Sequence, residues 1–196
     1  MTTIDVGHGF KESERDQVGA LYWEAFRRKL RPAFTNDAAG LTTIQAAIYS
    51  DRMLVARIKG EIAGVCGYHE QGAGAANLSW DLLRAHLSLA AAIRAVLFLS
   101  VLSNKERENV LVLDGICVHG DKRGRGVGTV LLDAAFDHAR SQNMKAVQLS
   151  VVDTNPRAEA LYRRLGFETI DAGSLDFLAP VYGFDRHTTM ERKLNQ

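Results

Sequence analysis

Apolar residues recur along the chain with two periods, one typical of helices and the other of strands. From Val18 to Leu30 they follow the i, i+3, i+4, i+7 spacing of an amphipathic helix, after a weakly alternating stretch at 2–6. Two further runs, 53–58 and 62–68, read as strands joined by the short turn Lys59-Gly60-Glu61. We therefore expect a strand, a helix and a hairpin in this order, with a short helix around 42–48 before the hairpin.

The pattern changes between 71 and 108. A glycine-rich stretch is followed by a very apolar one from Leu78 to Ser103, which predicts one or two helices. Charged residues such as Asp81 and Arg94 interrupt it, so it lacks the run of about 18 apolar residues that a membrane span needs. We expect a helical insertion that packs on the sheet, closes over a substrate cleft with Trp80 and Phe98, or forms the contact of a possible homodimer.

From residue 109 onwards the pattern predicts a β-turn-α-β unit. A β-rich run covers 110–118, a helix is expected at about 126–141, and a strand at 146–152. Asn155 and the proline after it form a typical helix start, and Gly166 a typical helix end. Two more strands are expected around 167–170 and 188–194, separated by a loop.

Composition narrows the class of protein. The 196 residues suit one domain, 1–196, with 71–108 as its insertion. With 24 basic and 23 acidic residues the formal charge is +1, which does not favour nucleic-acid binding. Cys66 and Cys117 lie in apolar strands without zinc-type spacing, so we expect buried free thiols and no metal. The N-terminal residues lack a signal-peptide pattern, which favours a cytoplasmic protein.

The glycine-rich turn after the 110–118 run carries the first chemical signal. Gly124, Gly126 and Gly128 stand between a strand and a helix, where free backbone N–H groups and the helix dipole favour an anion. The turn lacks the Gly-Lys-Ser/Thr of a phosphate-binding P-loop and the Gly-x-Gly-x-x-Gly of a dinucleotide site.

Two motifs together resemble the GNAT acetyltransferases. The family loop Arg/Gln-x-x-Gly-x-Gly/Ala is matched by Arg123, Gly126 and Gly128, and its element Asn-x-x-Ala-x-x-Leu-Tyr-x-x-Leu-Gly-Phe is matched from Asn155 to Phe167. The resemblance implies an α/β (α+β mixed) fold. Its central sheet would be mixed, mostly antiparallel and of about seven strands, flanked by helices, with the insertion between the third and fourth strands.

The resemblance also implies acetyl-CoA as the acyl donor and assigns residues to it. Asn155 would hydrogen-bond the pantetheine arm, although it suits a helix N-cap equally well. Tyr162 would protonate the departing thiolate, a role open to a phenol that is still protonated at neutral pH. The remaining donor-binding residues are expected to act mainly through their backbone: Ile116, Cys117, Val118, Arg123, Gly124, Arg125, Gly126, Val127, Gly128 and Thr129.

Acyl transfer to an amine needs a base or water relay, because an ammonium has no lone pair. Asp114, an acid inside an apolar strand, is the leading candidate; His119 comes next, and His69 and Glu70 are weaker ones. We expect an N-acetyltransferase acting on a primary amine, with a small molecule favoured over a protein. The alternative is a non-catalytic CoA-binding regulator on the same scaffold.

Overall fold

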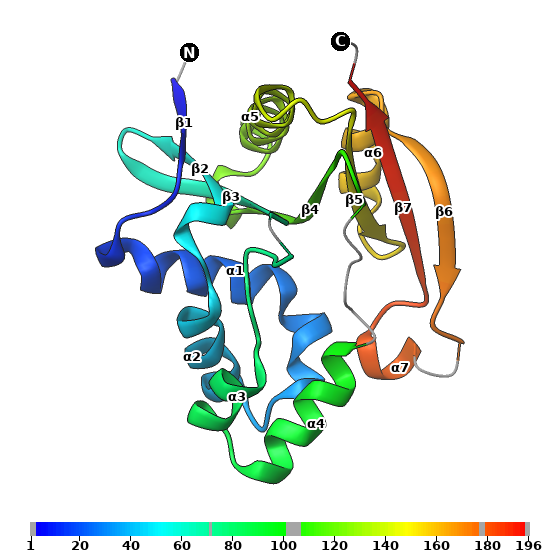
Figure 1. Ribbon diagram of the computed structural model, residues 1–196. Helices are drawn as coiled ribbons and strands as arrows, with labels where there is room; N and C mark the ends of the chain where they lie inside the picture. Colours follow the sequence, from blue (N-terminus) through cyan, green and yellow to red (C-terminus); the bar gives the residue numbers. More distant parts are fainter. Residues whose placement is uncertain (1–2, 71, 101–106, 177–178, 195–196) are drawn as a thin grey trace.

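The computed structural model describes residues 3–70, 72–100, 107–176 and 179–194. Within these, one seven-stranded sheet has the order β1-β2-β3-β4-β5-β7-β6 (Figure 1). Neighbouring strands are antiparallel except for β4 and β5, which are parallel. The strands are β1 (Ile4–His8), β2 (Met53–Ile58), β3 (Glu61–Tyr68), β4 (Val110–Val118), β5 (Ala146–Val152), β6 (Glu168–Ser174) and β7 (Arg186–Lys193).

Helices cover both faces of the sheet (Figure 1). One face carries α1 to α4 and the other carries α5, and each side has its own apolar core because strand residues alternate between them. Among the described residues, no helix is both long and apolar enough to cross a bilayer. The helices are α1 (Arg15–Leu30), α2 (Asp37–Ala47), α3 (Trp80–His86), α4 (Leu89–Ser100), α5 (Val127–Ser141), α6 (Pro156–Arg164) and α7 (Ala179–Tyr182).

The predicted fold class, a mixed and mostly antiparallel sheet of about seven strands with helices on its faces, is confirmed. A 3₁₀ turn, Glu12–Glu14, precedes helix α1, and the Glu14 carboxylate accepts a hydrogen bond from the Lys11 N–H (2.7 Å). The short helix α7 falls where a loop was predicted, and that prediction was wrong.

The expected insertion consists of α3 and α4, although residues 101–103 of the predicted helices lie outside the described residues. The two helices pack on α2 and on the 3₁₀ turn Arg31–Ala33. Leu83 and Ala92 are fully buried in these contacts, whereas Leu97 is 66% exposed. The insertion therefore extends the helical layer on the α1 side of the sheet.

Strands β4 and β5 run together for only three residue pairs, Val110–Val112 against Ala146–Gln148. Beyond them the strands diverge, and β5 continues in register with β7 alone. Part of the β4 edge therefore has no neighbouring strand on the β5 side within the described sheet.

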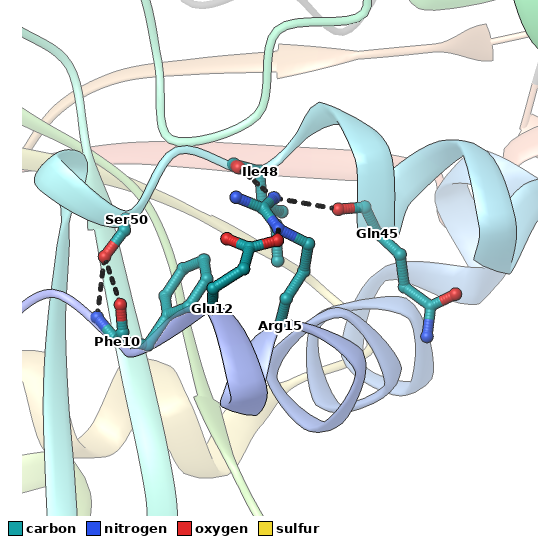
Figure 2. A network of polar contacts seen from close by, with 6 residues as sticks. All are labelled: Phe10, Glu12, Arg15, Gln45, Ile48 and Ser50. Carbon is teal, nitrogen blue, oxygen red and sulfur yellow. Dashed lines mark hydrogen bonds and ion pairs between the residues drawn. The ribbon is translucent and has the colours of Figure 1, made fainter.

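A network of polar contacts joins α1 to the end of α2 (Figure 2). The Arg15 guanidinium donates to the carbonyl oxygens of Gln45 (3.0 Å) and Ile48 (2.8 Å), and to the Glu12 carboxylate (2.5 Å). Beside it, the Ser50 hydroxyl accepts from the Phe10 N–H and donates to the Phe10 carbonyl, both at 2.7 Å. The last carbonyls of a helix need such donors, so Arg15 fixes the point where α2 ends.

The chain after α2 in turn holds the loop that follows β3. Tyr49 N–H donates to the Ala75 carbonyl (2.8 Å), Asn77 N–H donates to the Ala47 carbonyl (3.0 Å), and Ile48 forms a β-bridge with Ala76. The loop is therefore anchored to α2 by main-chain contacts before α3 begins.

Candidate functional site

Asp114 lies at a bulge in the centre of β4. On the neighbouring strand Gly67 pairs with Gly115, but Tyr68 pairs with Leu113, so Asp114 is the extra residue without a register partner. A bulge of this kind redirects side chains, and here Asp114 and Gly115 both face α1. A Cβ atom on Gly115 would overlap the Phe26 ring, which explains why a glycine follows the acid.

Both carboxylate oxygens of Asp114 have partners. Oδ1 is paired with His69 Nε2, and Oδ2 accepts a hydrogen bond from the Ala75 N–H (2.5 Å). The side chains of His69 and Asp114 are only 14% and 12% exposed. Gly74 packs so closely that a Cβ atom there would overlap Asp114 Oδ2. The loop after β3 is thus built around this carboxylate.

A cavity of about 310 Å³ opens on the Asp114–His69 pair. Its walls come from α1, α2, the loop after β3, α4, β4 and β5. They are mostly apolar, with a few polar groups, as in most small-molecule sites. The lining residues are Tyr22, Phe26, Lys29, Leu30, Ile44, His69, Gly74, Ala76, Leu78, Leu99, Asp114 and Ser150.

The other base candidates do not line this cavity. His119 is 47% exposed and borders a separate, polar hollow of about 460 Å³ with Glu14, Glu61 and Lys122. That hollow is larger, but it shares no lining residue with the cavity at Asp114. Glu70 forms a β-bridge with Ala73 just past the site.

The insertion contributes Leu78 and Leu99 to the cavity wall. The two aromatic residues expected there lie elsewhere: Trp80 is 46% exposed, and the Phe98 ring packs against Tyr182 at 6.0 Å between ring centroids. The sequence thus indicated the segment but not the side chains. It also gave no indication that Lys29, Gly74 and Ser150 line the cavity.

The glycine-rich turn forms the start of α5. Gly124 and Gly126 have φ values of 74° and 86°, in the left-handed region that glycine adopts without strain, and a Cβ atom on either would meet nothing within 4 Å. Arg123 Nε donates to the Val118 carbonyl (3.2 Å), which folds the turn back on the end of β4.

The amides at the start of α5 are suited to an anion. The first backbone bond of the helix runs from the Val130 N–H to the Gly126 carbonyl (3.0 Å), so the amides of Val127, Gly128 and Thr129 precede the helical ladder. Residues 123–126 are exposed, which leaves the positive end of the helix dipole open to a ligand. Arg125, also in this turn, adds positive charge.

Ile116, Cys117 and Val118 form the end of β4 beyond the point where β5 diverges. Cys117 is 1% exposed and Cys66 is fully buried on the neighbouring strand. Burial raises the pKa of the Cys66 thiol to about 12 and that of the Cys117 thiol even further above its ordinary value. The thiols are therefore unreactive packing groups, and Cys117 can offer a ligand only its backbone.

Tyr162 lies on α6 and is 8% exposed. Its ring is 5.9 Å from that of Phe167. Burial raises the pKa of its phenol well above the ordinary value near 10, and the Cys66 and Cys117 thiols act in the same direction. The phenol thus remains protonated at neutral pH and lies near the β3–β4 pair.

Asn155 is the N-cap of α6: its side-chain oxygen accepts a hydrogen bond from the Ala158 N–H (3.3 Å). The capping role weighed for this residue is therefore present. Capping uses Oδ1 and leaves the two N–H groups of the amide as potential donors to a ligand.

In the described part of the chain, no three His, Cys, Asp or Glu side chains gather as a metal site would require. The polar groups instead form two sets, one around Asp114 and one around the start of α5. The end of β4 runs between them.

Comparison with known proteins identifies relatives. The family model described as "Acetyltransferase (GNAT) family" matches residues 16–167. An uncharacterized N-acetyltransferase of Methanocaldococcus jannaschii is 40% identical over 67 residues, which are 34% of this chain and 30% of that protein. An L-methionine sulfoximine/L-methionine sulfone acetyltransferase of Pseudomonas aeruginosa is 38% identical over 53 residues, 27% of this chain and 31% of that protein. The chain thus matches less than a third of the length of these two relatives.

Among solved structures, an N-acetyltransferase from Staphylococcus aureus Mu50 superimposes with a TM-score of 0.69. The alignment covers 96% of this chain and all of that one, at 15% sequence identity. At such low identity the likeness concerns the fold alone.

Proposed function

The chain belongs to the GNAT acetyltransferase family, and on that premise we propose that it transfers the acetyl group of acetyl-CoA to a primary amine of a small molecule. The observation that carries the proposal is the Asp114–His69 pair, which faces a mostly apolar cavity near the divergence of β4 and β5. A buried carboxylate–imidazole pair in a cavity is a typical arrangement for moving a proton.

The donor would be held by backbone groups. In this proposal the amides of Val127, Gly128 and Thr129, with the turn 123–126 before them, bind the pyrophosphate. The free edge at Ile116, Cys117 and Val118 pairs with the amides of the pantetheine arm, and Asn155 donates to that arm. The open, strain-free glycine turn and the unpaired strand edge support this assignment.

Acetyl-CoA supplies an activated acyl group as a thioester, and the chain supplies orientation and proton transfer. An acceptor that arrives as an ammonium loses one proton to the Asp114–His69 pair, and its nitrogen then forms the C–N bond as the C–S bond breaks. Tyr162 Oη gives a proton to the leaving sulfur, and the second proton lost by the amide nitrogen, passed on through water, restores the phenol; the proton held by the Asp114–His69 pair goes to solvent. Overall one proton is released for each acetyl group transferred.

Within the pair, the two residues would have different roles. An imidazole is in general a better proton acceptor near neutral pH than a carboxylate. Asp114 would hold the His69 ring through Nε2 and stabilise its charged form, as carboxylates do for catalytic histidines elsewhere. The carboxylate would thus position the imidazole, and both groups line the cavity in which the amine would lie.

The test is a binding measurement followed by a turnover screen. Calorimetry with CoA and acetyl-CoA tests the donor site. Release of free thiol with a panel of apolar amino acids, aliphatic and aromatic amines, polyamines, aminoglycosides and peptides tests the reaction. Turnover of at least one primary amine supports the proposal. Tight CoA binding without turnover of any amine would favour the non-catalytic regulator, and absence of CoA binding would refute the donor site.

A further inference from the structure

Lys29 lies on α1, one turn after Phe26, and lines the cavity that holds Asp114 and His69. Its Nζ atom is 5.5 Å from the centre of the Phe26 ring and 5.9 Å from that of Phe184. The residue is partly buried, and burial lowers the pKa of its ammonium. An ammonium thus stands among aromatic rings inside the cavity.

Two neighbouring basic residues at this helix end share a carboxylate partner. Arg27 and Arg31 both form ion pairs with Asp37, at 2.6 and 2.7 Å. No carboxylate among the described residues forms an ion pair with Lys29; its contacts are with the two rings. Aromatic faces attract a cation, but a partly desolvated ammonium is stabilised further by an anion.

The cavity therefore offers groups of opposite charge within one apolar enclosure. The Asp114–His69 pair suits an amine, Lys29 suits an anion, and Leu30, Ile44, Leu78 and Leu99 supply apolar walls. This combination matches an amino group, a carboxylate and an apolar side chain on one small molecule. A volume of about 310 Å³ is at the lower end for ligand sites, which suits such a small acceptor.

We propose that Lys29 binds the carboxylate of the acceptor, and that the acceptor is an apolar amino acid whose amine lies at Asp114 and His69. The inference rests on the proposed acetyl transfer and specifies its substrate class. Lys29 acts as a specificity-determining residue and takes no part in the proton transfer.

The experiment compares amino acids with analogues that lack only the carboxylate. L-leucine, L-methionine and L-phenylalanine are each measured beside the decarboxylated amine and the primary amide, with acetyl-CoA and thiol release as the readout. In the wild-type protein, kcat/KM for the best amino acid should exceed that for its two analogues by roughly 30-fold or more, as expected when one partner of a desolvated charge contact is lost. The difference should lie mainly in KM.

Lys29→Met should reduce the ratio of kcat/KM between the amino acid and its analogues to near 1, and Lys29→Arg should retain most of this ratio. Lys145→Met is the matched control, because Lys145 is exposed and does not line the cavity. This variant should show the same kcat/KM ratio as the wild type. Circular dichroism and CoA affinity check that each variant is folded. If Lys29→Met fails this check, the wild-type comparison alone decides.

The outcomes separate the two proposals. Amines and amides turned over as well as the amino acids would overturn the role of Lys29 and leave the acetyltransferase proposal intact. The role of Lys29 would also be overturned if the wild type and Lys29→Met preferred the amino acids over the analogues to the same degree. An equal loss of kcat for all substrates in Lys29→Met would overturn it as well. Failure of every amine in this panel and in the wider screen would remove both proposals.

Discussion

His69 Nε2 and Asp114 Oδ1 are paired in the folded protein, although the whole 71–108 segment separates the two residues in the sequence. The pairing depends on the β3–β4 ladder and its bulge. The His69 N–H donates to the Val112 carbonyl (2.8 Å), which fixes the backbone from which the imidazole extends. The two residues thus belong to one rigid part of the sheet, which suits a site that must hold a proton-transfer geometry.

Asp114→Asn should reduce kcat/KM for the amine by roughly 100- to 10,000-fold, because the amide keeps the shape but neither accepts a proton nor stabilises a charged imidazole. Acetyl-CoA affinity should not change. Steady-state kinetics and calorimetry measure the two effects. Asp121→Asn, the same change on an exposed acid away from the cavity, is the control. Equal activity of the two variants would exclude Asp114 from the chemistry.

Gly74→Ala should move the Asp114 carboxylate, because the added methyl group would overlap Oδ2. A displacement of about 1 Å at a reacting group can cost on the order of 100-fold in rate. We expect a loss in kcat of this order with unchanged CoA binding. Gly7→Ala, where a Cβ atom meets nothing within 4 Å, should be neutral in the same assays. A fully active Gly74→Ala protein would show that the loop does not position the acid.

Tyr162→Phe should slow acetyl transfer by roughly 10- to 1000-fold while fold and CoA affinity are kept. Burial raises the pKa of Tyr162, so its protonated form persists above pH 10 and the phenol can donate throughout the neutral and mildly alkaline range. Tyr49→Phe, at an exposed tyrosine, is the control. An unchanged rate under conditions where chemistry limits turnover would assign the proton to water or to another residue.

Gly126→Asp and Gly126→Asn form a matched pair for the phosphate site. Gly126 has a φ of 86°, and both Asn and Asp tolerate left-handed backbone better than other residues, so the two variants differ mainly in charge. Calorimetry at low salt should show CoA binding weakened at least about 10-fold more by Asp than by Asn, because the carboxylate repels the pyrophosphate. Equal affinities would mean that no anion binds at this turn.

Arg15→Met should destabilise the protein by about 1–3 kcal/mol, because the Gln45 and Ile48 carbonyls lose their donor (Figure 2). Urea unfolding monitored by fluorescence measures this change. Arg140→Met removes an exposed pair with Asp137 and should cost less than about 1 kcal/mol. Similar stabilities of the two variants would show that α2 ends stably without Arg15.

The sequence predicted well those features that depend on neighbouring residues. Strands β4 and β5 have the expected bounds, and the glycine turn with the start of α5 follows from local glycine spacing. The cavity was harder to predict because it combines residues of α1, α2, the loop after β3, the insertion, β4 and β5. Lys29 resembles the charged neighbours Arg27 and Arg31 in sequence, and only the packing separates it from them.

The bulge at Asp114 had a weak signal in the sequence. The dipeptide Asp114-Gly115 interrupts an otherwise apolar strand, and a glycine inside a strand often marks a bulge or a close approach. That signal could have directed attention to the carboxylate's surroundings. The partner His69 has no such mark, since a histidine after a strand is in most cases exposed to solvent.

The divergence of β4 and β5 leaves part of the β4 edge unpaired inside the described sheet. Its open inner edge at Ile116–Val118 is short and lies beside Tyr162 on α6, unlike the outer edges formed by β1 and β6. Unpaired strand edges tend to recruit an extended chain, and in an ordinary sheet this leads to aggregation. In the proposed function this edge would instead pair with a ligand that has an extended arm and its own amide groups, and the ligand would take the place of a strand.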